Sequence, residues 1–186
     1  MSANVIYDKK FTSIHLLPKG DYENCLFTRC KMGGTDLSGI SFTECTFVET
    51  DLSATRLMGT ALRGVHFEDC KMMGLKFNHC DPFLFSIKCS RCTLNFASFF
   101  QCDLTRSHFK GCRLIDVDFA EANLTEVCLD QCDLQGAQFE NTLLRKCDFR
   151  TAYNVSLSLE MNDLKGARFT LEGLPGLLAP YGIEIE

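Results

Sequence analysis

The side chains with the most reactive chemistry in this 186-residue chain are its twelve cysteines and four histidines. Cys89 and Cys92 form a lone C-x-x-C with no second pair, so a redox or zinc site is the weaker interpretation. A free cysteine behaves as a small, easily buried apolar residue. We therefore expect reduced, inward-facing thiols at the cysteines that recur at multiples of five residues within two sets: Cys25, Cys30, Cys45, Cys70 and Cys80, and then Cys92, Cys102, Cys112, Cys132 and Cys147.

No arrangement of polar residues indicates catalysis. Gly39 and Gly136 are examples of glycines scattered among turn positions rather than gathered in a phosphate-binding loop. Serines and threonines have no histidine and acid at a fixed spacing beside them. The histidines lie at unrelated positions without a metal-ligand spacing: His15, His66, His79 and His108. We therefore predict no catalytic residues, no cofactor and no metal site.

A five-residue period decides which elements hold these side chains. From Tyr22 to Phe77 every fifth residue is large and apolar or aromatic, and the row resumes two residues out of step from Leu84 to Phe169, with Asn154 as a polar member. A five-residue step drifts around an α-helix and changes face on a flat strand. A second row of smaller residues lies two positions earlier and returns to the same side of an extended segment. A chain that turns a corner every five residues buries both rows.

Three segments resemble the A-(D/N)-L-x-x signature of the pentapeptide repeat family: Thr35-Asp36-Leu37-Ser38-Gly39, Ala122-Asn123-Leu124-Thr125-Glu126 and Ala167-Arg168-Phe169. The resemblance covers roughly residues 20–170. It implies an all-β fold, a right-handed four-sided (quadrilateral) β-helix with four pentapeptides in each coil. In such a coil Cys92, Cys112 and Cys132 are expected to stack as a ladder.

The repeat pattern divides the chain into one β-helix domain, residues 1–170, and a tail, residues 171–186. Residues 1–19 are only partly in register and are expected to cap the first coil. The register slips within residues 78–83, where Pro82 cannot donate to a ladder, so we expect a bulge or short loop. Residues 152–161 are expected to form a local loop.

The tail has the composition of a cap and a dimer contact. Pro175 suits the first turn of a short helix, and Gly182 releases the chain into a strand-like end. A two-fold contact between identical tails would bury both copies and end further growth, whereas a cap on a monomer is the alternative. The predicted dimerisation residues are apolar: Leu174, Leu177, Leu178, Ile183 and Ile185.

Charge gives the remaining indication of function. The net charge is −5, whereas duplex DNA of the length of this rod, about 36 Å, would carry roughly 21 negative charges, so the chain as a whole is a weak imitation of DNA. One side carries no Lys or Arg in residues 117–121, 137–141 and 157–161, and its acids are Asp118, Glu121, Glu140 and Glu160. These acids are either a partner-binding surface or an ordinary solvated face. The absence of a basic cluster disfavours direct binding of nucleic acid.

A closer resemblance is to the Qnr-type quinolone-resistance and topoisomerase-poison immunity branch of that family. It rests on Tyr7-Asp8-Lys9-Lys10-Phe11, on Cys25-Leu26-Phe27 and Cys45-Thr46-Phe47, and on residues 148–154 and 174–185. It implies a non-enzymatic, rod-shaped homodimer that presents a DNA-like surface to DNA gyrase or topoisomerase IV. A rigid scaffold for a non-topoisomerase partner stays open as the alternative. No stretch approaches the length of a membrane span, and we expect a cytoplasmic location.

Overall fold

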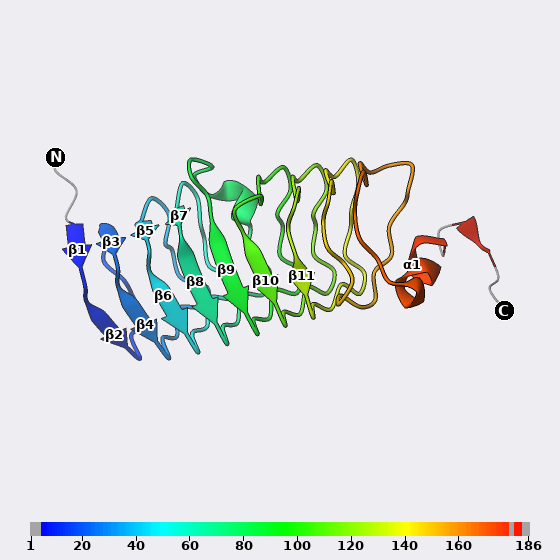
Figure 1. The fold of residues 1–186 in the computed structure, drawn as a ribbon. Coiled ribbons are helices and arrows are strands. Elements are labelled where there is room, and N and C mark those ends of the chain that lie inside the picture. Colours follow the sequence, from blue (N-terminus) through cyan, green and yellow to red (C-terminus); the bar gives the residue numbers. More distant parts are fainter. Residues whose placement is uncertain (1–4, 179–180, 184–186) are drawn as a thin grey trace.

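A computed structural model describes residues 5–178 and 181–183 of the chain. Figure 1 shows an elongated stack of coils, with β1 (Val5–Tyr7) at one end and α1 (Leu174–Leu178) at the other. The fold is an all-β parallel solenoid, as the five-residue period predicts. Within the described ranges, no helix has the length and apolarity that a membrane span requires.

The strands form two parallel sheets along the solenoid. The first sheet has the order β1-β3-β5-β7, and the second has the order β11-β10-β9-β8-β6-β4-β2. Beyond β1 the strands are β2 (Lys10–Thr12), β3 (Asp21–Glu23), β4 (Leu26–Thr28), β5 (Ser41–Thr43), β6 (Thr46–Val48), β7 (Ala61–Arg63), β8 (Val65–Glu68), β9 (Ile87–Ser90), β10 (His108–Lys110) and β11 (Leu129–Asp130). The remaining elements are the 3-10 helices η1 (Phe77–His79) and η2 (Leu171–Gly173).

Strand pairing fixes the length of a coil. Asp21 pairs with Ser41, and Phe109 pairs with Leu129, so equivalent residues are twenty positions apart, which is four five-residue repeats. The first pairing is shorter, because Val5 pairs with Asp21 at a distance of sixteen residues. Residues 5–12 thus extend both sheets as a shortened coil at the N-terminal end. The handedness of the coil and its square cross-section stay predictions.

Both predicted inward rows are buried over most of the length. Phe27 stacks on Phe47 with ring centroids 4.5 Å apart, and in the second half Phe99 stacks on Phe119 at 5.4 Å. The smaller row is buried beside these rings, as at Cys45. Stacking of like residues in successive coils gives each large side chain neighbours above and below, which produces a continuous core rather than separate clusters.

The corners are turned by residues in the left-handed region. Gly39 has φ 69°, and the equivalent corner at Asn24 has φ 52°. Glycine adopts this conformation without a Cβ penalty, and asparagine tolerates it better than most residues. Glycines in the repeats therefore mark corners, which confirms their assignment to turns.

The register slip is accommodated between Asp81 and Ser86. Ala61 pairs with Asp81 at an offset of twenty residues, whereas Val65 pairs with Ile87 at an offset of twenty-two. The extra length protrudes at the corner after Pro82. The expectation that Leu84 is inward is wrong, because Leu84 is 46% exposed with φ 57°.

Phe85 occupies the inward place that Leu84 was expected to fill. Its ring meets that of Phe77 edge-on, with centroids 6.3 Å apart. The protruding corner is held by Arg63, which donates to the Phe83 carbonyl at 3.2 Å and to Asp81 Oδ2 at 2.7 Å. Two extra residues are thus absorbed at one corner, and the core beyond them resumes its period.

A second departure lies in residues 152–161. The expectation that Asn154 and Leu159 point inward is wrong, since both are exposed. Asn154 turns the chain at φ 57° and donates its side-chain N–H to Asp133 Oδ1 at 2.7 Å. Val155 and Leu157 are buried in place of the expected residues.

Candidate functional site

Asp118 lies on one wall of the solenoid in a fixed conformation. It pairs with Ser98 in the preceding coil and with Gln138 in the following coil. Its Oδ1 accepts the Ala120 backbone N–H at 3.0 Å, and its Oδ2 accepts the Ser98 hydroxyl at 3.0 Å. The carboxylate is half-buried and held by two donors, so it presents its charge at a defined position.

Glu121 lies at the corner of the same five-residue repeat. Its backbone N–H donates to the Glu140 carbonyl at 2.8 Å, which puts Glu140 in the next coil beside it. Glu121 Oε2 accepts a hydrogen bond from Gln101 Nε2 at 2.8 Å. Both glutamates are exposed. Three of the four predicted acids therefore lie on two successive coils of one wall.

Glu160 follows on the irregular segment of the next coil. The Asn141 N–H bonds to the Met161 carbonyl at 2.8 Å, so the end of this segment returns to the wall that carries Glu140. Glu160 is exposed. We call the four residues Asp118, Glu121, Glu140 and Glu160 the acidic face.

The acidic face is free of opposite charges. Within the described residues, no Lys, Arg or His nitrogen lies within ion-pair distance of its four carboxylates. The adjacent wall differs, because Lys146 pairs with Glu126 at 2.6 Å. That hydrogen bond from Lys146 lowers the pKa of the Glu126 carboxyl below its usual range. Within the described residues, the four carboxylates of the acidic face therefore carry negative charge that no ion pair compensates.

Ten of the cysteines are buried, Cys102 is half-buried and Cys128 is exposed. The twelve are free thiols, and burial raises the pKa of Cys45 to about 12. Cys132 lies against Cys112, and this contact raises the pKa of the Cys132 thiol. Cys112 in turn lies beside Cys92, so the predicted ladder is confirmed. A buried, protonated thiol is a weak nucleophile.

Histidines and acids do not assemble into a ligand set. His66 and His108 both pair with Lys88 in the second sheet, so a cation separates them. Across the residues that the structure describes, no group of three or more His, Cys, Asp or Glu side chains has the geometry to hold a metal ion.

The C-terminal tail packs on the end of the solenoid. Leu177 is 7% exposed and joins the core, and Gly176 lies so close to the Val155 carbonyl that no side chain would fit. Leu174 and Ile183 remain 41% and 53% exposed, and Leu178 is half-buried. Ile185, the fifth predicted dimer residue, lies outside the described residues.

The sequence reasoning missed the neutral partners of the acids. Ser98 and Gln101 lie twenty residues before Asp118 and Glu121, and each donates to the acid in the next coil. The twenty-residue coil length would have identified both, because equivalent positions of successive coils are in contact.

Comparisons with known proteins agree with this architecture. The family model described as pentapeptide repeat region matches residues 21–99 and 90–169. Two trypsin-treated forms of QnrB1, a plasmid-mediated fluoroquinolone resistance protein, have similar solved structures. One has a TM-score of 0.64 and 19% sequence identity, and the alignment covers 99% of this chain and 98% of that chain. The other has a TM-score of 0.64 and 18% identity, with 99% of each chain covered. No curated protein sequence shows a significant match.

Proposed function

This chain belongs to the pentapeptide repeat family, and we propose that it is a non-enzymatic protein that binds DNA gyrase or topoisomerase IV through the acidic face. The face imitates a short stretch of duplex DNA, and binding protects the enzyme from a fluoroquinolone or a related poison. The structural likeness to QnrB1, a fluoroquinolone resistance protein, supports this choice of partner.

The observation that carries the proposal is the density of unpaired carboxylates. The four acids occupy three successive coils, and two coil spacings are about 10 Å at the usual distance between neighbouring strands. Duplex DNA carries about six negative charges over that length. The acidic face therefore reaches roughly two thirds of the charge density of DNA, although the chain as a whole carries a net charge of only −5.

Rigidity makes this charge useful for recognition. Asp118 is fixed by two hydrogen bonds, and Glu121 is fixed by Gln101. Like charges held at defined positions, as at Asp118 and Glu121, attract a basic DNA-binding surface over long range and raise the association rate. Because little order is lost on binding, exposed carboxylates contribute more here than they would on a flexible loop.

We also propose a homodimer joined through the C-terminal tail. Leu177 anchors α1 to the solenoid, whereas Leu174 and Ile183 leave apolar surface beside it. A two-fold contact between tails buries that surface and doubles the length of the rod. Such a dimer carries two acidic faces, and the expected location of its topoisomerase partner is the cytoplasm.

A rigid scaffold for a different partner is favoured by one observation. The wall that carries the acidic face has Arg56 and Lys76 in its N-terminal half. Duplex DNA has a single sign of charge along its whole length. A partner with charges of both signs would fit this wall over a longer distance than a DNA-binding surface does.

A supercoiling assay separates the two functions. Purified chain is titrated into DNA gyrase, relaxed plasmid and ATP, with and without ciprofloxacin. Our proposal predicts that the chain raises the ciprofloxacin concentration needed for half inhibition, and that added salt weakens this effect because the attraction is electrostatic. If the chain at micromolar concentration changes neither supercoiling nor its inhibition by ciprofloxacin, the topoisomerase proposal is contradicted. The scaffold function would then be the one that remains.

A further inference from the structure

One wall of the solenoid is closed by the same backbone hydrogen bond in successive coils. The Asp81 N–H donates to the Thr60 carbonyl at 2.9 Å, and the Asn123 N–H donates to the Cys102 carbonyl at 2.9 Å. The equivalent bond between them would join the Asp103 N–H to the Cys80 carbonyl. The structure shows no such bond, so these two coils are not joined at this position, although the Ser86 hydroxyl donates to the Arg106 carbonyl at 2.9 Å farther along.

The register slip explains the opening. Pro82 has no N–H to offer, and the 3-10 turn η1 ends at His79, three residues before it. The extra residues then protrude outward. As a result, no neighbouring backbone hydrogen bond between the two coils holds Cys80 close to Asp103. The Asp103 N–H and the Cys80 carbonyl therefore lie at the edge of a hollow and are not hydrogen-bonded to each other.

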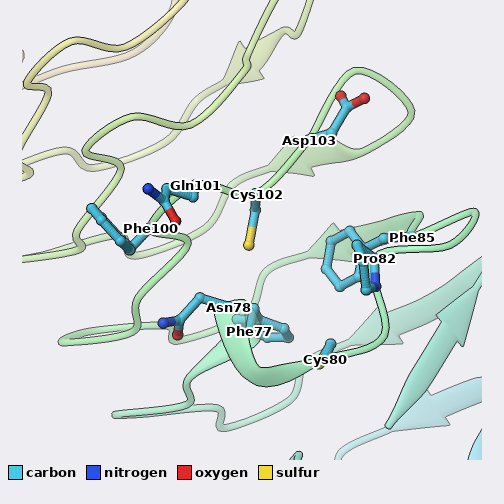
Figure 2. Close-up of a pocket in the computed structure, with 9 residues that line it drawn as sticks. All are labelled: Phe77, Asn78, Cys80, Pro82, Phe85, Phe100, Gln101, Cys102 and Asp103. Carbon is cyan, nitrogen blue, oxygen red and sulfur yellow. The ribbon is translucent and has the colours of Figure 1, made fainter. Parts of the chain in front are cut away.

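A cavity of about 350 Å³ lies in this opening. Figure 2 shows the Cys102 sulfur directed into the hollow towards Phe77 and Asn78, with Pro82 and Phe85 along one side. The volume is in the range of small-molecule sites. Pro82, which is exposed, and the half-buried ring of Phe100 supply apolar surface, and the buried rings of Phe77 and Phe85 lie behind it, which favours a flat apolar group.

Apart from the Asp103 carboxylate, which is directed away from the hollow (Figure 2), the polar side chains of the cavity are neutral. Burial raises the pKa of Cys102 to about 12 and also raises the pKa of Cys80, so both thiols are protonated at neutral pH. Asn78 and Gln101 contribute carboxamides, and no Lys, Arg or His is among the lining residues. One oxygen of the Asp103 carboxylate already accepts the Thr105 N–H at 3.0 Å.

We propose that this cavity binds a neutral, planar ligand that carries an amide on an apolar ring. The ligand's carbonyl accepts from the Asp103 N–H, and its N–H donates to the Cys80 carbonyl. The ligand thereby bridges the two backbone groups that are hydrogen-bonded directly at the equivalent positions of the neighbouring coils. An anion meets no compensating cation there, and a cation loses hydration against apolar side chains and neutral thiols. The site lies beside Gln101, which also contacts the acidic face, but the proposal stands independently of the proposed function.

Benzamide is a suitable probe, because benzoate and benzamidinium have nearly the same shape with a negative and a positive charge. A ¹⁵N-labelled full chain is titrated with each compound, and the amide resonances are followed. We expect benzamide to produce a saturable shift at Asp103, with the Asn123 amide as the internal control because its bond to Cys102 is already made. In the free chain, we expect the Asp103 amide to exchange with solvent at least tenfold faster than the Asn123 amide.

A cavity-filling variant sharpens the result. Cys102→Leu is expected to abolish the shift at Asp103, whereas Cys128→Leu, on the exposed side of the next coil, is expected to retain it. The proposal is overturned if benzamide gives no saturable shift in the native chain, or if benzoate and benzamidinium shift the Asp103 amide equally well. An Asp103 amide as protected as that of Asn123 would also overturn it.

Discussion

The N-terminal and C-terminal halves of one wall share a core and differ in surface charge. In the N-terminal half, Asp36 pairs with Lys19 at 3.8 Å and with Arg56 at 3.5 Å, and Lys76 adds a further positive charge. In the C-terminal half, the same wall carries the four acids of the acidic face and no ion pair among the described residues.

The core beneath this wall does not change with the charge above it. Phe77 and Phe99 stack with ring centroids 4.5 Å apart across the junction of the two halves. Phe119 and Phe139 continue the stack at 5.3 Å under the acidic face. Inward residues thus specify the solenoid, and outward residues are free to specify a partner.

The largest expected effect comes from the shared core. Phe109→Ala and Phe27→Ala, one in each half, are each expected to lower the free energy of unfolding by about 3–5 kcal/mol, because both rings are buried between neighbouring coils. Thr105→Ala, at an exposed position, is the matched control and should change it by less than about 0.5 kcal/mol. Urea unfolding measures all three.

A nearly neutral Phe109→Ala would show that the assigned inward row is wrong. A large difference between Phe27→Ala and Phe109→Ala would show that the two halves do not share one cooperative core.

Removal of the tail tests whether the two ends of the rod differ in function. Light scattering of the full chain at micromolar concentration is expected to give about twice the mass of 20.9 kDa. Deletion of residues 171–186 is expected to give a monomer of lower thermal stability, because Leu177 leaves the core. Leu174→Ser, at an exposed site, is expected to weaken the dimer with little loss of stability. A monomeric full chain, or a dimer that survives the deletion, would contradict the dimer assignment.

The smallest expected effect comes from the ion pairs of the other walls. The hydrogen bond from Arg150 lowers the pKa of the Asp148 carboxyl. A lowered pKa in the folded state stabilises the fold above the ordinary value near 4, and this contribution is lost as the pH falls further. Between pH 6 and pH 3, we expect the free energy of unfolding to fall more in the wild-type chain than in Asp148→Asn. The expected difference between the two decreases is below about 1 kcal/mol. Urea midpoints at both pH values measure it, and a greater loss in the variant would reverse the assigned sign.

Most of the solenoid could be predicted because its period is strict. The inward rows from Tyr22 to Phe77 and from Cys89 to Phe149 follow from spacing alone, since each position repeats the same local geometry. The prediction was wrong at Leu84 and Asn154, where the chain uses a left-handed turn that the period cannot reveal. At Asn154 a side-chain hydrogen bond to Asp133 accompanies the turn, and at Leu84 the chain carries two residues more than a regular coil.

The site was predictable only as a set of charges. The twenty-residue coil length predicts that Asp118, Glu121 and Glu140 lie on one wall. It does not predict the path of residues 152–161, which carry Glu160. The missing backbone hydrogen bond between Asp103 and Cys80 also had a signal in the sequence, because Pro82 and the register slip mark its position. Its consequence, a cavity between two coils, depends on how the extra residues swing out, which no local pattern determines.

The most direct test of the account compares two variants with equal net charge. Asp118→Asn, Glu121→Gln, Glu140→Gln and Glu160→Gln together neutralise the acidic face. Asp21→Asn, Glu23→Gln, Glu44→Gln and Glu49→Gln neutralise four acids of the N-terminal half that make no ion pair within the described ranges.

Binding of both variants to immobilised DNA gyrase is measured beside the wild-type chain, with urea unfolding as the check on folding. The account predicts that neutralising the acidic face weakens binding at least tenfold and leaves the unfolding midpoint nearly unchanged, since exposed charges contribute little to stability. It predicts near-normal binding for the N-terminal variant. Equal binding by the two variants would contradict the account.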